Sequence, residues 1–276
     1  VSFKDYSPSG FLGHLKDRIE KMILCGYYGY RSVHKNHSLC FLGRVLGYLR
    51  YFRMKATWDL EDIFLSYKED RKGYLLIDVG CGEGTYLEKM KKLGWPVLGI
   101  EPHEDGCRML AQKDIPFLKG TLDDAGQLPD STADQVTLIH VLEHVYDPLA
   151  AINACYRLLK KGGRLIIHVP NSQSLTHKVF KRKCYHLDAP RHIFSFSVKS
   201  LRLFFEKSLF REISLKTTSF NAKSSYDSSR EISKKGFRPI NGVKRQRGRF
   251  LFCCIESLLI MCGYPAGEEI RVVAVK

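Results

Sequence analysis

The feature that most constrains this chain is a short apolar segment that runs directly into three alternating glycines. Residues 74–79 read Tyr-Leu-Leu-Ile-Asp-Val, and Gly80, Gly82 and Gly84 follow before a helical pattern begins at Thr85. An apolar run of this length predicts a buried strand. Glycines let the chain turn sharply and let a ligand approach the backbone closely. The segment therefore predicts a strand, a ligand-binding loop and a helix within an α/β fold.

Short apolar strands alternate with helical patterns after this loop. Strands are predicted at 97–100, 117–118, 135–140, 164–169, 211–217 and 269–275, and helices at 85–93, 105–113, 148–160, 200–207 and 250–262. This alternation is typical of a parallel sheet with helices on both faces. The polar segment 221–249, rich in serine and then in basic residues, is predicted to be a flexible loop.

Two acids flank the glycine loop. Asp78 ends the first strand, and Glu101 ends the next strand about twenty residues later, where an acid can accept both hydroxyls of a ribose. A dinucleotide-binding loop has the spacing G-x-G-x-x-G and a helix N-terminus open to pyrophosphate. Here the spacing is G-x-G-x-G, and Asp78 and Glu83 would repel a pyrophosphate. The sequence therefore favours a neutral or cationic nucleoside over NAD.

Three later segments, taken with this loop, resemble the motifs of class I S-adenosylmethionine-dependent methyltransferases. Residues 134–145 resemble the family's fourth-strand segment with its Leu-Glu-His turn, and residues 158–171 resemble its fifth-strand segment. Residues 187–195 resemble a block of a bacterial subgroup that often acts in polysaccharide, quinone or small-metabolite pathways. The resemblance implies S-adenosylmethionine as cofactor. It also implies a Rossmann-like, seven-stranded, mostly parallel sheet with an antiparallel last strand, joined by a helical N-terminal segment and a C-terminal insertion.

The resemblance also implies roles for single residues. Cofactor contacts are expected from Asp78, Gly80, Cys81, Gly82, Glu101, Pro102, Thr121, Leu122 and His140. The first four would line the methionine half of the cofactor, Glu101 would hold the ribose, and Pro102 would flank the adenine. At the adenine edge the family usually carries a small residue followed by an acid. Here the match falls on Thr121 and Leu122, which departs from that pattern, and His140 would lie beside the amino-acid group.

Transfer of a methyl group to a hydroxyl also requires removal of a proton, which histidine can accept near neutral pH. His144, after the fourth predicted strand, and His192, in the block at 187–195, are the candidate catalytic residues, and a structural role stays open for both. Arg191 could clamp a phosphate or carboxylate of the acceptor or be a solvated surface arginine. Asn171 is expected on the substrate side. No metal-ligand spacing stands out, so no metal is predicted.

Composition narrows the choice of partners. The net charge of +15 favours an anionic acceptor, nucleic acid or an anionic membrane face, or reflects a generally basic surface. The nine cysteines include no C-x-x-C pair and are predicted to be reduced thiols of a cytoplasmic protein. Neither a secretory signal nor an apolar stretch of membrane-spanning length is visible.

The predicted organisation is a helical N-terminal lid over 1–72, a cofactor-binding core over 73–220, a substrate-side insertion over 221–265 and the final strand over 266–276. The basic amphipathic run 39–54 could instead lie on a membrane. The predicted function is methyl transfer, at oxygen, to a small-molecule acceptor or a glycan- or lipid-linked one, with an anionic acceptor favoured by the charge. The alternatives are a nucleic-acid methyltransferase and a non-catalytic module of the same fold at a membrane surface.

Overall fold

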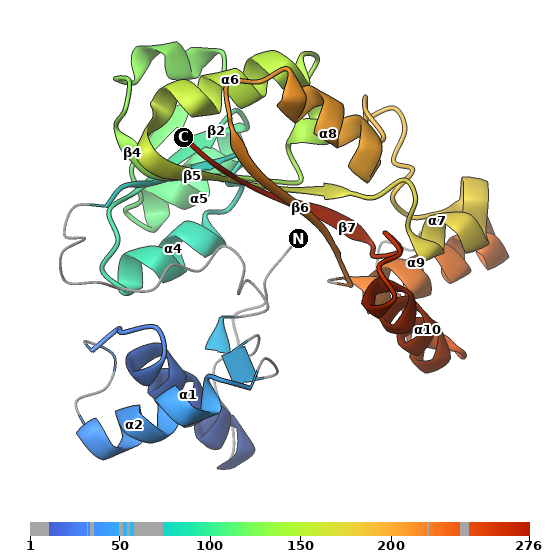
Figure 1. Cartoon of the computed structure of the whole chain (residues 1–276), viewed down its shortest axis with the longest axis horizontal. Coiled ribbons are helices and arrows are strands. Elements are labelled where there is room, and N and C mark those ends of the chain that lie inside the picture. The colour runs from blue at the N-terminus through green and yellow to red at the C-terminus, as the bar shows by residue number, and fades with distance from the viewer. Residues whose placement is uncertain are drawn as a thin grey trace. The chain divides into compact units, whose positions relative to one another are not determined.

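The structure is a computed structural model that describes residues 11–31, 33, 36–49, 52–53, 56–57, 74–219, 221–237 and 243–276. The chain divides into two compact units (Figure 1). The smaller comprises Val1–Tyr74 and Gly84–Val97, and the larger comprises Leu75–Glu83 and Leu98–Lys276. The predicted helical segment 1–72 includes residues 1–10 and 58–72, which lie outside the described residues.

The helices of the smaller unit whose bounds the structure describes are α1 (Phe11–Gly26), α2 (His37–Leu46) and α4 (Thr85–Lys92). The first two approach closely at glycines, since a Cβ on Gly43 would lie 1.9 Å from the carbonyl oxygen of Met22. A disulfide joins Cys25 of α1 to Cys40 of α2, whose Cα atoms are 5.4 Å apart. The prediction of reduced thiols is therefore wrong for this pair, because the pairing depends on how the two helices pack and not on a local sequence motif.

The larger unit is built on a sheet that, in the part of the chain described, has seven strands in the order β3-β2-β1-β4-β5-β7-β6. The strands are β1 (Leu76–Val79), β2 (Val97–Glu101), β3 (Phe117–Lys119), β4 (Ala133–Ile139), β5 (Leu159–Pro170), β6 (Glu212–Thr218) and β7 (Glu269–Val275). β4 pairs parallel with β1 and β5, whereas β7 pairs antiparallel with β5 and β6. The predicted Rossmann-like sheet with an antiparallel last strand is confirmed.

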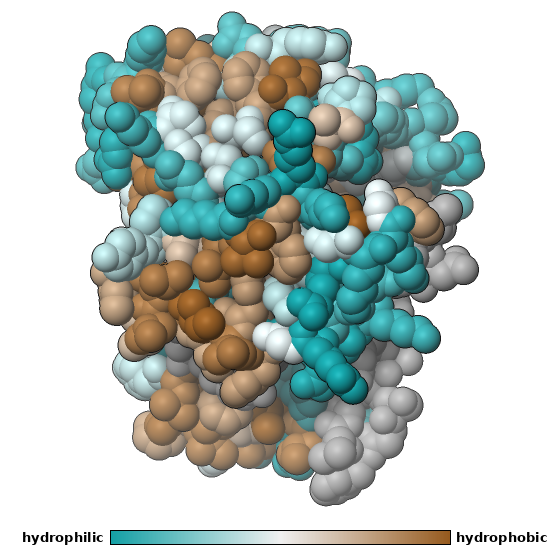
Figure 2. All heavy atoms as spheres, turned by 90° about the vertical axis from the view of Figure 1, so that its right-hand side faces the viewer, coloured by the Kyte–Doolittle hydropathy of each residue, from teal (hydrophilic) through white to brown (hydrophobic). Residues whose placement is uncertain are grey.

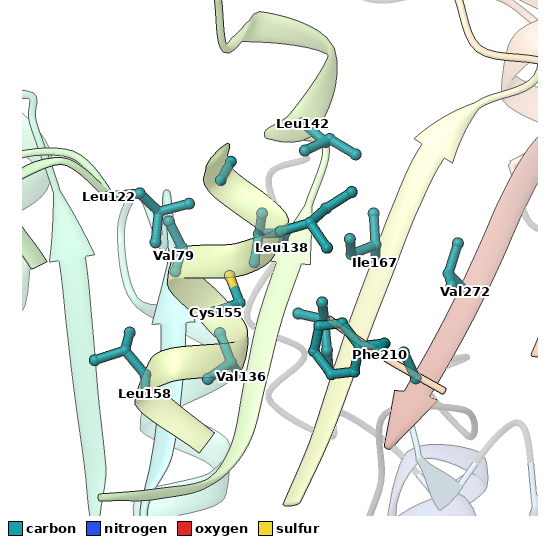
Figure 3. Close-up of a cluster of buried hydrophobic side chains, with 14 of the residues drawn as sticks. Val79, Leu122, Val136, Leu138, Leu142, Cys155, Leu158, Ile167, Phe210 and Val272 are labelled. Carbon is teal, nitrogen blue, oxygen red and sulfur yellow. The ribbon is translucent and has the colours of Figure 1, made fainter. Parts of the chain in front are cut away.

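The core of this unit lies between the sheet and two helices, α6 (Pro148–Leu158) and α8 (Val198–Glu206). Figure 3 shows Val136 of β4 beside Cys155 and Leu158 of α6, and all three side chains are fully buried. β4 and β5 lie near the middle of the sheet, which explains why residues 136–138 and 165–169 are buried on both faces.

The remaining helices frame the ends of the strands. α5 (Glu104–Gln112) follows β2 and contacts β3, while α7 (Leu175–Phe180), α9 (Ala222–Lys235) and α10 (Arg249–Met261) gather on the right of Figure 1. Single turns of 3₁₀ helix are η2 (Asp124–Gln127), η3 (Leu142–His144) and η4 (Lys181–Lys183). Among the residues that the structure describes, no helix has both the length and the apolar character needed to cross a bilayer.

The predicted flexible loop after residue 221 is wrong for α9, which is a regular helix. This helix buries a polar face that includes Ser225 and Ser229. Ser229 Oγ accepts the amide of Tyr185 at 2.9 Å, and Ser225 Oγ lies 2.8 Å from His186 Nε2. Hydrophobic periodicity does not detect a helix whose buried face is polar.

Candidate cofactor and acceptor site

The glycine loop leaves β1 along a backbone path that strongly favours glycine. Gly80, Gly82 and Gly84 have φ angles of 65°, 54° and 69°. Gly80 excludes a side chain for a second reason, because a Cβ there would lie 2.5 Å from Val141 Cγ2. The loop therefore presents bare backbone against which a ligand can lie.

Glu101, the last residue of β2, is 3% exposed and is held by backbone amides. Its Oε2 accepts the N–H of Gly82 at 2.8 Å, and its Oε1 accepts the N–H of His103 at 2.9 Å. A carboxylate has about four acceptor positions, so roughly two remain for hydroxyl donors. Gly106 of α5 makes room for this carboxylate, since a Cβ there would lie 2.7 Å from Glu101 Cγ. No sequence motif points to Gly106.

Asp78 lies buried in β1, and its Oδ1 accepts a hydrogen bond from Thr137 Oγ1 at 2.6 Å. Burial raises the pKa of Asp78 to about 7; the Thr137 hydrogen bond opposes this, and the charge of Glu101 adds to it. A cationic ligand at this point would favour the ionised carboxylate. Burial and the same two carboxylates raise the pKa of Cys81, so its thiol stays protonated and acts as a small neutral side chain.

The loop after β3 lies next to Glu101, whose main-chain oxygen accepts an amide of that loop at 3.1 Å. The amide of Thr121 donates to Asp124 Oδ2 at 2.8 Å, and its Oγ1 lies 3.3 Å from the same oxygen. Asp124, which the sequence pattern did not indicate, therefore fixes this loop. Leu122 is buried in the core, whereas Pro102 is exposed beside Glu101.

His140 follows β4 and lies between two buried carboxylates. Its Nδ1 is 3.3 Å from Glu143 Oε1, and its Nε2 is 3.2 Å from Glu269 Oε1. Burial alone would lower the pKa of His140, but these two carboxylates raise it to about 10. Its ring is therefore an imidazolium at neutral pH. Glu269 is also contacted by Asn221 Nδ2, at 2.7 Å, and by His168 Nδ1, at 3.4 Å.

His144 and His192 lie side by side, with ring centroids 4.8 Å apart. Nδ1 of His144 is 2.8 Å from the carbonyl oxygen of Arg191, and Nδ1 of His192 is 2.9 Å from that of His186. Because a carbonyl oxygen only accepts, each neutral ring carries its proton on Nδ1 and offers the lone pair of Nε2. Burial lowers the pKa of His192, which favours its neutral form.

Glu143 joins this histidine pair. Its main-chain oxygen accepts the amides of Ile193 and Phe194, which anchors the segment carrying His192. Its Oε2 is buried and has no hydrogen-bond partner within the described part of the chain. One ligand atom each from Glu143, His144 and His192 lies within 4.8 Å of the others. These groups can pass a proton between them, or can supply carboxylate and imidazole ligands to a divalent cation.

The two residues predicted to bind the acceptor have partners within the protein. Arg191 is exposed and forms an ion pair with Asp188. Asn171 is buried, and its Nδ2 donates to the carbonyl oxygens of Pro265 and Gly267, each at 2.8 Å. The amide of Asn171 therefore ties the end of β5 to the segment that precedes β7.

Residues 53–214 match the protein-family model described as a methyltransferase domain. The matched residues make up more than half of the chain. The chain belongs to this methyltransferase family. It is similar to a ubiquinone biosynthesis O-methyltransferase of Xanthomonas oryzae pv. oryzae, with 32% identity over 114 residues, 39% of this chain and 48% of that protein. The ubiquinone biosynthesis O-methyltransferase of Pseudomonas entomophila is 29% identical over 131 residues, which are 44% of this chain and 56% of that protein. The chain thus spans about half the length of these curated relatives.

Solved structures show the same fold. A SAM-dependent methyltransferase from Archaeoglobus fulgidus has a TM-score of 0.51 at 22% identity, covering 74% of this chain and 87% of that one. The plantazolicin methyltransferase BamL, solved with SAH and a plantazolicin analogue, has a TM-score of 0.52 at 11% identity, covering 96% and 99%. The family model confirms the predicted membership of a methyltransferase family, and the solved structures confirm the predicted fold.

Proposed function

We propose that the protein transfers a methyl group from S-adenosylmethionine to a hydroxyl oxygen of a small-molecule acceptor. The observation that carries the proposal is the placement of the glycine loop, Asp78 and Glu101 together, with a histidine pair beyond β4. The curated relatives that are named O-methyltransferases support oxygen as the acceptor atom.

Three side chains match three parts of the cofactor. Glu101 keeps acceptor capacity for the ribose hydroxyls. Asp78 would be drawn into its ionised form by the α-ammonium group, because a neighbouring cation opposes the effect of burial. His140, whose two ring nitrogens already face Glu143 and Glu269, would lie beside the α-carboxylate and offset the charge of these two acids there. When bound, the cofactor supplies a methyl group on a positively charged sulfur, which is a good leaving group.

On the acceptor side, we assign proton removal to Nε2 of His192, with His144 beside it. Alignment of the reacting groups supplies the larger part of the rate, roughly 7–11 kcal/mol. Proton removal adds about 10²–10⁴-fold. The narrower proposal of an anionic or lipid-linked acceptor is supported by exposed cations that follow β5, namely Lys178, Lys181 and Arg182.

Calorimetric titration of S-adenosylmethionine and S-adenosylhomocysteine tests the cofactor site. Asp78→Asn and Glu101→Gln should each weaken binding by about tenfold or more, because each removes a charge-assisted hydrogen bond to the ligand. Asp123→Asn is the matched control: this acid is exposed near the same loops and should bind as the wild type does. If the folded wild-type protein bound neither adenosyl ligand, the proposal would be wrong.

The acceptor is sought among phenols, catechols and sugar hydroxyls, with labelled cofactor and mass spectrometry of the product. His192→Gln should lower kcat by about 10²–10⁴-fold while cofactor affinity is retained. A parallel assay with a chelator separates two ways of removing the proton. Activity lost on chelation and restored by a divalent cation would assign the step to a cation held by Glu143, His144 and His192. Methylation of nitrogen or carbon alone would overturn the choice of oxygen, and methylation of RNA alone would overturn the choice of a small-molecule acceptor.

A further inference from the structure

Helix α10 turns its apolar side chains outward and its acidic side chain inward. Six large apolar residues of this helix and the turn after it are 43–83% exposed, namely Phe250, Leu251, Ile255, Leu258, Met261 and Tyr264. Glu256, the one acid in α10, is fully buried. A helix that faces only water has the reverse arrangement, because burying apolar area is favourable and burying a carboxyl group is costly. The outer face of α10, defined by these six residues, is therefore suited to an apolar covering.

The exposed charges of segment 221–265 are of one sign. The acids of segment 221–265 are Asp227, Glu231 and Glu256, and all three are buried. Asp227 is also paired with Arg249, and Glu231 with Lys235. Exposed cations without an ion-pair partner among the described residues are Lys223, Lys244, Arg245 and Arg247. The surface of this insertion is therefore apolar and cationic, with its negative charge held inside.

The outward orientation is fixed by contacts on the inner side of α10. Phe252 packs against Tyr226 of α9 with ring centroids 4.7 Å apart, and Arg249 Nη1 lies 2.8 Å from Asp227 Oδ2. Figure 2 looks onto the side of the molecule that carries α7, α9 and α10, and shows apolar surface next to strongly hydrophilic surface. The apolar residues thus stay exposed because the opposite side of the helix is already packed.

We propose that the outer face of α10 binds the surface of an anionic phospholipid bilayer. An amphipathic helix of this kind lies in the plane of the interface, with apolar side chains at the acyl boundary and cations at the headgroup phosphates. The uniform positive charge selects this occupant over a second copy of the chain, because two such faces would bring like charges together. With 13 residues, α10 is too short to span the bilayer and would lie on it.

Vesicle co-sedimentation of the full chain tests the proposal without any need for turnover. Vesicles of phosphatidylcholine mixed with phosphatidylglycerol should bind the protein at least about tenfold more tightly than phosphatidylcholine alone, and added salt should weaken binding. The double variant Phe250→Ser, Leu258→Ser should reduce partitioning by about tenfold or more. The double variant Lys244→Ala, Arg245→Ala should reduce it by a similar factor, since each cation near the surface contributes about fivefold.

Matched variants on α8 and just after it control for a general loss of apolar or cationic surface. Leu203→Ser with Leu209→Ser, and Lys199→Ala with Arg202→Ala, change equally exposed residues and should leave vesicle binding unchanged. Failure of the wild type to bind the mixed vesicles, or equal binding by the α10 variants, would overturn the proposal. So would a wild type that self-associates without binding vesicles and becomes monomeric in the Phe250→Ser, Leu258→Ser variant. Soluble glycerophosphate that binds as tightly as the mixed vesicles would assign the site to a free phosphate instead.

Discussion

The carboxyl group on the inner side of α10 should make the larger unit less stable as the pH rises. Burial and the nearby Glu268 raise the pKa of Glu256 to about 8. Since an unfolded glutamate titrates near pH 4.3, the folded state holds the extra proton between about pH 4.3 and 8. The free energy of unfolding then falls by about 1.4 kcal/mol for each pH unit, and the total loss approaches about 5 kcal/mol above pH 8.

Glu256→Gln keeps the shape of the side chain but cannot ionise, so this slope should disappear. Burying an unpaired amide group costs about 1–3 kcal/mol. The variant should therefore be slightly less stable than the wild type at about pH 5, where the carboxyl group of Glu256 is protonated. At about pH 8.5 it should be more stable, by roughly 2–4 kcal/mol. The measurement is urea unfolding followed by circular dichroism. Tryptophan fluorescence would not serve, because Trp95, the tryptophan that the structure describes, belongs to the smaller unit.

Glu206→Gln on α8 is the matched control for this experiment. Glu206 is exposed, so its replacement should leave the dependence of stability on pH unchanged. If Glu256→Gln kept the wild-type slope between pH 5 and pH 8.5, the buried carboxyl would already be ionised in the folded state. The reasoning from burial would then be wrong.

Three further predictions follow from the site and the smaller unit. Gly106→Ala should weaken S-adenosylhomocysteine binding by about tenfold, because the new Cβ would displace Glu101; Gly126→Ala, where a Cβ would meet nothing within 4 Å, should bind normally in the same titration. Reduction of the α1–α2 disulfide should lower the unfolding free energy of the smaller unit by about 3 kcal/mol. The fluorescence of Trp95 reports the unfolding of this unit. A stability unchanged by reductant would show that helix packing alone holds the pair. Because burial lowers the pKa of His192, kcat should rise with pH through an inflection below pH 6.5 and be level above it; an inflection above that point would exclude His192 as the base.

The parts of the fold that sequence predicts well are those specified by neighbouring residues. β1, the glycine loop and Glu101 follow one another within about thirty residues. The pattern of apolar residues indicates the strands, and the spacing of the glycines indicates the edge of the sheet where a ligand binds. The alternation of strands and helices after them sets the parallel order, and the antiparallel last strand came from family resemblance. What these patterns specify is a backbone path, so the positions of Asp78 and Gly80 could be expected in advance.

The errors have a common physical origin in contacts between distant segments. The cysteines of α1 and α2 pair only once the helices cross at Gly43, and no local motif reports that crossing. α9 buries Ser225 and Ser229 at helical spacing, and both find partners on the segment near Tyr185, so a pattern based on hydrophobicity assigns the helix to a loop. These hydrogen bonds offset the cost of burying the two hydroxyl groups, and the partners lie far away in the sequence.

His140 depends on distant contacts more strongly than the glycine loop does. His140 stays charged because Glu143, three residues on, and Glu269, at the start of β7, both face it. Burying three ionisable groups together is costly unless each is paired. The antiparallel placement of β7 beside β5 is what brings Glu269 to this point, so the last strand belongs to the site as well as to the sheet. A family motif can indicate His140, Glu143 and His144, but the charge on His140 also depends on Glu269, which that motif does not contain.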